Sequence, residues 1–132
     1  MSPVETALVF GYRATDALGL ATVVQNLLPT ADPAALHRAF SLATQPGQIE
    51  TTCLFLDAGE DPNRFNPPGT HSHTPPIHQA VWNGHLEVVR LLLERGTRLD
   101  IFDTVFRSTP LGWAQLGGQH EIVKYLETLS PV

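Results

Sequence analysis

The 132-residue chain has a single cysteine, Cys53, and a single lysine, Lys124. One cysteine excludes an intramolecular disulfide and any metal site built from several thiolates, and it agrees with a reducing compartment. The other basic residues are scattered arginines and the formal net charge is −5, so there is no basic stripe of the kind that binds phosphate backbones. No apolar run approaches the ~20 residues of a membrane span, and the N-terminus lacks the pattern of a signal peptide. We therefore expect a cytoplasmic protein with no nucleic acid and no membrane among its partners.

Catalytic motifs are also missing. The sequence contains no nucleophile placed beside a base, no glycine-rich phosphate loop and no pair of carboxylates suited to acid–base chemistry. Its length is that of one ordinary domain with its own core and is too short for a two-domain cofactor enzyme. The sequence therefore predicts a single domain that is not an enzyme and needs no cofactor.

What the chain does contain is a series of short helical segments separated by proline and glycine. Helices are predicted over about 3–13, over 20–27, from 33 to about 43, and over 49–56, where Gly59 follows the helix end. Helices of about 8–12 residues bury too little apolar surface to be stable alone. We therefore predict an all-α fold in which consecutive helices stack.

The second half of the chain repeats itself. Ala80 and Gly84 recur 34 positions later as Ala114 and Gly118, within the same order of turn, helix, turn and helix. The same glycine stands 37 positions before Gly84, at Gly47. The small residues let two helices approach closely, and the glycines allow the positive φ of a tight reversal. A period of about 33 residues built in this way indicates a helical repeat solenoid.

Two motifs relate this repeat to a known family. The segment 74–78, with the sequence TPPIH, is similar to the Thr-Pro-Leu-His motif of ankyrin repeats, and 58–63 is similar to the segment that leaves their second helix. Gly112 stands where the motif's histidine would be in the last repeat. The likeness is strongest over 67–129, weaker over 33–66 and weakest over the first thirty residues. The chain therefore resembles the ankyrin-repeat family, in particular its small stand-alone bacterial members.

This resemblance implies an all-α ankyrin-repeat solenoid of about three repeats with β-turn fingers, forming one domain over 1–132. A degenerate helical pair at 1–31 would serve as a cap or repeat, followed by repeats at 32–66, 67–103 and 104–132. In this family His78 would brace the turn by hydrogen bonding to backbone. Repeat stacks display side chains on an extended concave surface. The implied function is a non-enzymatic adaptor or inhibitor that binds another protein.

Trp82 is a candidate anchor for that partner. On a helix that starts at Ile77, the core stripe is formed by Ile77, Ala80 and Val81, and Trp82 lies off this stripe. In the family's pattern its position faces the concave surface, where an indole either anchors a partner or is covered by the finger. Trp113 is expected in the core instead.

The second finger, residues 99–108, is unusually apolar. Its side chains exceed what a finger tip buries, so the tip packs on the first finger through Phe65, meets a partner, or is hidden in a homodimer. The predicted partner-binding residues are Phe65, Trp82, Asn83, Phe102, Val105 and Phe106, with Arg64 and Arg107 as rim charges.

An alternative from another class is a small-molecule or metal-binding site, with a catalytic role open. His71 and His73 lie in a longer first finger, where residues two apart point the same way in an extended loop. The cleft would be roofed by Phe65 and floored by Trp82. Zinc prefers four ligands and no third ligand is evident nearby, so histidines that hydrogen-bond to the loop are the simpler interpretation.

Overall fold

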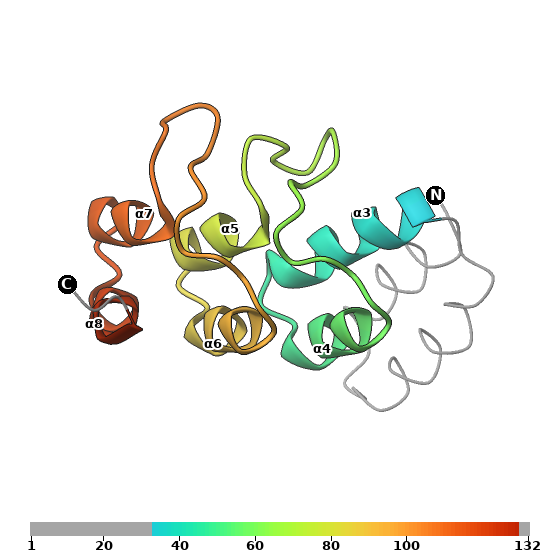
Figure 1. Ribbon diagram of the computed structural model, residues 1–132, viewed down its shortest axis with the longest axis horizontal. Coiled ribbons are helices and arrows are strands. Elements are labelled where there is room, and N and C mark those ends of the chain that lie inside the picture. The colour runs from blue at the N-terminus through green and yellow to red at the C-terminus, as the bar shows by residue number, and fades with distance from the viewer. Residues whose placement is uncertain (1–32, 130–132) are drawn as a thin grey trace.

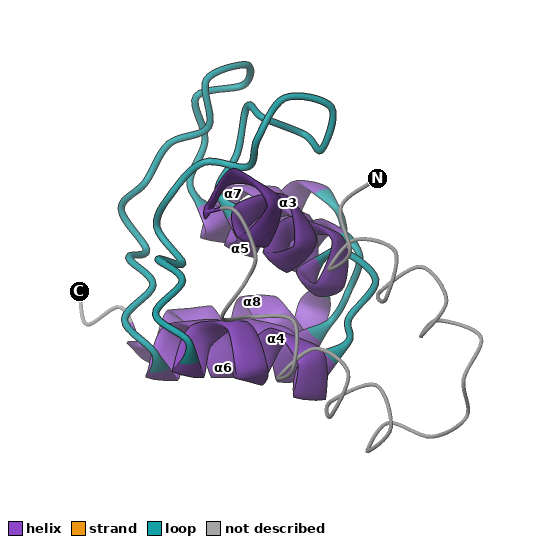
Figure 2. Cartoon of the chain, turned by 90° about the vertical axis from the view of Figure 1, so that its right-hand side faces the viewer, coloured by secondary structure: helices purple, strands orange, loops and turns teal. Residues whose placement is uncertain are grey.

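The computed structural model describes residues 33–129, whose helices alternate between two layers. The six helices of that range are α3 (Pro33–Thr44), α4 (Ile49–Asp57), α5 (Pro76–Trp82), α6 (Leu86–Glu94), α7 (Pro110–Leu116) and α8 (His120–Leu129). Figures 1 and 2 show α3, α5 and α7 in one layer and α4, α6 and α8 in the other. No strand occurs within residues 33–129. The predicted all-α fold of stacked helices is confirmed.

Two long loops connect the helical pairs α3–α4, α5–α6 and α7–α8. We call residues 58–75 finger one and residues 95–109 finger two; both project beyond the layer of α3, α5 and α7 (Figure 1). Finger one is three residues longer than finger two, which accounts for the spacing of 37 rather than 34 between equivalent glycines. The helices expected over 3–13 and 20–27, and the cap or repeat at 1–31, lie outside the described residues.

Proline begins the first helix of the last two pairs, and a glycine turn follows it. Pro76 and Pro110 occupy the first turn of α5 and α7, where a missing backbone N–H leaves no hydrogen bond unmade. The Thr109 hydroxyl caps α7 by accepting a hydrogen bond from the Gly112 N–H at 3.2 Å. Gly84 follows α5 with a φ of 77°, a left-handed conformation that favours glycine. These are the turn roles that the repeat predicted.

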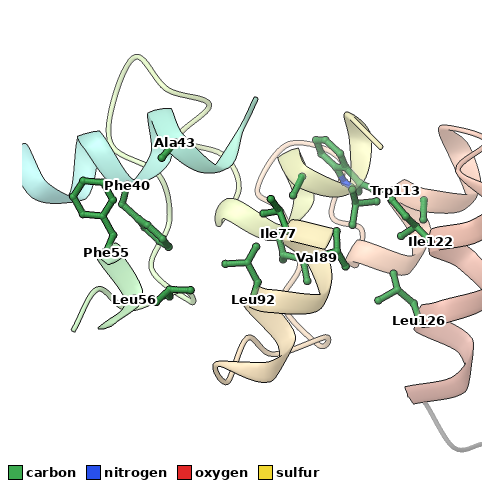
Figure 3. Packing of buried hydrophobic residues seen from close by; sticks show 14 of the residues in the cluster. Phe40, Ala43, Phe55, Leu56, Ile77, Val89, Leu92, Trp113, Ile122 and Leu126 are labelled. Atoms are coloured by element: carbon green, nitrogen blue, oxygen red, sulfur yellow. The ribbon is translucent and has the colours of Figure 1, made fainter. Parts of the chain in front are cut away.

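One apolar cluster runs through all three helical pairs (Figure 3). Ile77 and Val89 are fully buried in it, and Leu111 packs against it. The buried members are Ala39, Phe40, Ala43, Phe55, Leu56, Ile77, Ala80, Val81, Val88, Val89, Leu92, Trp113, Ala114, Ile122 and Leu126. Because each short helix buries its apolar face only against its neighbours, this cluster holds the solenoid together.

Two buried histidines fix the fingers to the first helices. The Nε2 of His78 in α5 lies 3.0 Å from the carbonyl oxygen of Ser108, and the Nε2 of His37 in α3 lies 2.7 Å from that of Phe65. A carbonyl oxygen only accepts, so Nε2 carries the proton in both rings. Burial lowers the pKa of His78 below its ordinary value, although the bond to Ser108 and the nearby Asp103 act in the opposite direction. The predicted bracing role of His78 is confirmed.

Replacing Leu92, which is fully buried in α6, with Ala should lower the free energy of unfolding by about 2–5 kcal/mol. The substitution removes buried methyl groups and leaves a cavity in the shared cluster. Urea denaturation followed by circular dichroism measures the change. The matched control is Leu116→Ala, whose side chain is 79% exposed and whose loss should cost no more than about 0.5 kcal/mol. Equal losses in the two variants would contradict the role given to the cluster.

Candidate functional site

The two fingers and the helices α5 and α7 form a pocket of about 280 Å³. It is lined by His71 and His73 of finger one, Gln79 and Trp82 of α5, Phe106 and Ser108 of finger two, and Gly112, Trp113 and Leu116 of α7. The lining is mainly aromatic and apolar and contains no Lys, Arg, Asp or Glu. A space of this volume accommodates one large side chain or a small ligand.

Trp113 forms the base of this pocket and contacts four other rings. Its centroid lies 5.8 Å from that of Trp82 and 5.9 Å from that of Phe106, with interplanar angles of 80° and 73°. The rings of His73 and His78 lie 6.0 Å and 5.4 Å away. The edge-to-face pairs with Trp82 and Phe106 contribute about 0.5–1.5 kcal/mol each beyond their buried area. The indole therefore joins both fingers to α5 and α7.

Asp103 orients this indole and the tip of finger two. Its buried carboxylate accepts a hydrogen bond from Trp113 Nε1–H at 2.9 Å and three more from the backbone N–H groups of Val105, Phe106 and Ser108. Burial alone would raise the pKa of Asp103, but these four hydrogen bonds outweigh it and lower the pKa to about 2. Asp103 is therefore an anion at neutral pH, directly behind the pocket.

Two glycines at α7 allow neighbouring side chains to approach this helix closely. A Cβ on Gly112 would lie 2.0 Å from Oγ of Ser108, so a larger residue at this position would require the Ser108 hydroxyl to move. A Cβ on Gly117 would lie 3.2 Å from the ring of Trp82, closer than most such contacts. The missing side chains let Ser108 and Trp82 approach α7 from both sides.

A family model supports the repeat assignment. The model for ankyrin repeats (3 copies) matches residues 13–103 and again residues 36–128, which together cover most of the chain. The chain belongs to the ankyrin-repeat family. Within residues 33–129 none of the helices of this ankyrin-repeat protein has the length and apolar content that crossing a bilayer requires.

Curated relatives of this ankyrin-repeat protein include two kinase inhibitors. It is 33% identical over 122 residues to cyclin-dependent kinase inhibitor 2A of Monodelphis domestica, an alignment that covers 88% of this chain and 69% of the relative. It is 32% identical over 122 residues to cyclin-dependent kinase 4 inhibitor B of Homo sapiens, covering 89% and 86%. Ankyrin repeat and SAM domain-containing protein 6 of Mus musculus is 44% identical over 69 residues, covering 52% and 8%. All three relatives are eukaryotic, so they do not support the resemblance to bacterial members.

Two of the eight predicted partner-binding residues of this ankyrin-repeat protein line the pocket. Trp82 and Phe106 line it and are 46% and 68% exposed, whereas Phe102 and Val105 are exposed but lie outside the lining. Sequence reasoning missed Leu116, which is exposed at the end of α7. Leu116 is 34 positions after Trp82 and so occupies the same place in the next repeat. The helical position that places Trp82 off the core stripe therefore also predicts an exposed side chain at Leu116.

The other predicted contacts have different surroundings. Arg64 and Arg107 are exposed, and so is Asn83, whose amide donates to the carbonyl of Gln45 in the preceding repeat at 3.0 Å. Phe65 is half-buried. Packing of the apolar tip on Phe65 was one of three alternatives, and within residues 33–129 Phe65 makes no ring contact with finger two.

The predicted place of Trp113 in the core is confirmed, and the same residue also contacts the apolar tip. The ring that Phe106 contacts is that of Trp113. Trp113 was expected in the core, and it is only 7% exposed, yet it also lines the pocket. An indole can serve both purposes because its N–H is satisfied by Asp103 while part of its ring system lines the pocket.

His71 and His73 lie together, with ring centroids 6.0 Å apart, and both line the pocket. The carbonyl of His73 accepts a hydrogen bond from the Thr104 N–H at 3.0 Å, which joins the two fingers. The hypothesis of a metal or small-molecule site placed the two histidines in one cleft with Trp82 and Phe65. The pocket contains both histidines and Trp82, but its lining includes Phe106 and not Phe65. Within residues 33–129 no group of three or more His, Cys, Asp or Glu side chains is placed to hold a metal ion.

Asp103→Asn should lower the free energy of unfolding by about 1–3 kcal/mol, because an amide NH₂ would then face N–H donors. Urea denaturation measures the loss. Asp100→Asn removes the same charge from an exposed position paired with Arg98, and we expect it to cost no more than about 0.5 kcal/mol.

The same variants give a pH dependence with a definite sign. Folding lowers the pKa of Asp103 from 3.8 to about 2. The contribution of its carboxylate to the free energy of unfolding is therefore fully present above the pH range in which a carboxyl group ordinarily titrates, and it is lost as the pH falls through about 2. The stability difference between wild type and Asp103→Asn should therefore shrink on acidification below pH 4. A difference that stays constant down to the acid limit of folding would contradict this assignment.

Proposed function

We propose that this chain is a protein-binding adaptor or inhibitor without catalytic activity, and that its concave face and fingers contact the partner. The observation that carries the proposal is the exposed apolar surface around the pocket. Trp82, Phe106 and Leu116 are exposed at the pocket, and Phe102 and Val105 extend the surface along finger two. Large apolar side chains gathered on one face are typical of protein contact sites.

The hydrogen bonds behind this surface also suit it to binding. The tip of finger two is held by three backbone hydrogen bonds to Asp103, and its base by His78. Finger one is joined to finger two through the carbonyl of His73. A contact surface that is ordered before binding loses less conformational entropy when the partner arrives. Arg64 and Arg107, exposed on the fingers, would then serve as rim charges.

The relatives favour inhibition over an adaptor role. Two relatives that align with 88% and 89% of this chain carry the names of cyclin-dependent kinase inhibitors. We therefore propose a cyclin-dependent protein kinase as the first class of partner to test. The proposed contact surface follows from the exposed residues of this chain and not from those names.

Trp82→Ala should weaken binding to purified cyclin-dependent kinase 4 by more than about 1 kcal/mol, or roughly fivefold, because it removes an exposed aromatic anchor. Its free energy of unfolding should fall by no more than about 0.5–1.5 kcal/mol, the contribution of the ring pair with Trp113. Isothermal titration calorimetry measures the affinity. The matched control is Leu129→Ala on α8, which removes a similarly exposed side chain, 43%, away from the pocket and should keep full affinity.

Each contrary result has a separate meaning. If the wild type does not bind the kinase, the partner class is wrong, and quantitative pull-downs with the same two variants test the surface itself. Equal recovery of partners by Trp82→Ala and Leu129→Ala would then contradict binding through the concave face. A loss of several kcal/mol of stability in Trp82→Ala would show that the indole is part of the core.

Sedimentation of the free protein tests the homodimer, which a constant mass of 14.4 kDa at all concentrations would exclude.

The alternative of a metal or small-molecule site has one observation in its favour, because His71 and His73 share the pocket of about 280 Å³. If the pair binds a metal, Zn²⁺ or Ni²⁺ should raise the thermal midpoint of the wild type and a chelator should reverse the rise. His73→Ala should abolish the effect, whereas Ser72→Ala, an exposed neighbour in the same loop, should keep it. If no metal ion changes the thermal midpoint of the wild type, the metal site is contradicted.

A further inference from the structure

We propose that the pocket between the fingers binds the N-methylated ammonium group of a lysine side chain on the partner protein. This rests on the proposed function and deepens it, because it states what the partner presents to the pocket. Three aromatic rings and one buried carboxylate, all from residues of this chain, carry the argument.

The rings form a box. Trp113 is the base, and Trp82 and Phe106 stand on it at 80° and 73°, with centroids 5.8 and 5.9 Å from that of Trp113. Trp82 and Phe106 are largely exposed, so the box opens toward solvent, while Trp113 is nearly buried. A cation within about 6 Å of several aromatic ring centroids is attracted by each of them, most strongly by tryptophan. The geometry is therefore suited to a rounded cation that touches three rings at once.

The charges around the box favour a cation over a neutral side chain. Within residues 33–129 no Lys or Arg lines the pocket, and the one charged group there that is hydrogen-bonded to its rings is the carboxylate of Asp103, 2.9 Å from Nε1 of Trp113. A hydrogen bond to an anion increases the electron density of the indole, which strengthens its attraction for a cation. The net charge of −5 acts in the same direction at long range. His71 and His73 are the titratable groups of the lining, and their protonation would oppose a cation.

The hydrogen-bonding capacity of the pocket decides which cation fits. Asp103 already accepts four hydrogen bonds, and the lining has no carboxylate of its own. An ammonium or guanidinium group that entered the pocket would lose its hydrogen bonds to water and would find no carboxylate acceptors to replace them. N-methylation removes those N–H donors while keeping the positive charge, so a methylated lysine loses the least on entry. About 280 Å³ holds the methylated head group and the end of its methylene chain.

The two tryptophans of the chain make a direct test possible. Trp82 and Trp113 are the sole tryptophans and both line the pocket, so intrinsic fluorescence reports on its occupation. Three blocked amino acids serve as probes: trimethyl-lysine, lysine, and the neutral isostere in which carbon replaces the ammonium nitrogen. Titrations are run at pH 8, above the ordinary titration range of imidazole. We expect trimethyl-lysine to bind about threefold to thirtyfold more tightly than its neutral isostere, and unmodified lysine to bind more weakly than trimethyl-lysine.

A matched pair of variants assigns the effect to the box. Phe106→Leu keeps an apolar wall but removes the aromatic face, and it should bring the affinity ratio of trimethyl-lysine to the neutral isostere close to one. Phe102→Leu makes the same change at a side chain that is also exposed, 58%, and on the same finger but outside the pocket, and should leave the ratio unchanged. Both residues are exposed, so neither change is expected to disturb folding.

Equal or tighter binding of the neutral isostere to the wild type would contradict the preference of the pocket for a cation. The pocket would then be a site for an apolar side chain. Binding of unmodified lysine as tight as that of trimethyl-lysine would overturn the requirement for methylation. No fluorescence change with any probe at millimolar concentrations would overturn the pocket as a ligand site. None of these results touches the loss of partner binding in Trp82→Ala, which tests the proposed function separately.

Discussion

The burial of short helices against their neighbours is the constraint on which this molecule depends. The longest described helix has 12 residues and two of them have seven, lengths at which helix formation in water is unfavourable without tertiary contacts. Ile77 and Val89 are buried only because α5 and α6 pack between the pairs before and after them. Each repeat therefore owes its structure to the next one, and a cavity in one repeat affects the whole stack.

The fingers are stabilised by different means, since they have no helix and little apolar interior of their own. Finger two is built around Asp103, whose carboxylate collects three backbone N–H groups and the indole of Trp113. These bonds place apolar side chains such as Phe106 outside the core in a fixed position. The hydrogen bonds to the Asp103 carboxylate thus hold the apolar tip of finger two in place, so the tip does not need a hydrophobic core of its own.

The sequence predicted the scaffold well and the site only in part, and the reason is physical. Helix boundaries and the reversal at Gly84 follow from local rules that act over a few residues, whereas the bracing by His78 was implied by the family resemblance. The position of Trp82 off the core stripe also followed from helical spacing, whereas its exposure was one of two open alternatives. The partner of Phe106 did not, because the contact with Trp113 depends on how two loops fold across a neighbouring repeat. For Asp103 the sequence suggests a turn residue, and nothing local indicates that Nε1 of Trp113, ten positions away, completes its set of donors.

The pocket shows why a repeat protein acquires specificity between its repeats and not within them. Trp82 comes from one helical pair, Trp113 and Leu116 from the next, and the two fingers supply one wall each. No single repeat contains the site. Finger one, which is three residues longer than finger two, contributes His71 and His73 to the pocket. A change in finger length or in the stacking of α5 on α7 would therefore alter the pocket while leaving each repeat's own turns and helices intact, so binding can diverge without cost to the fold.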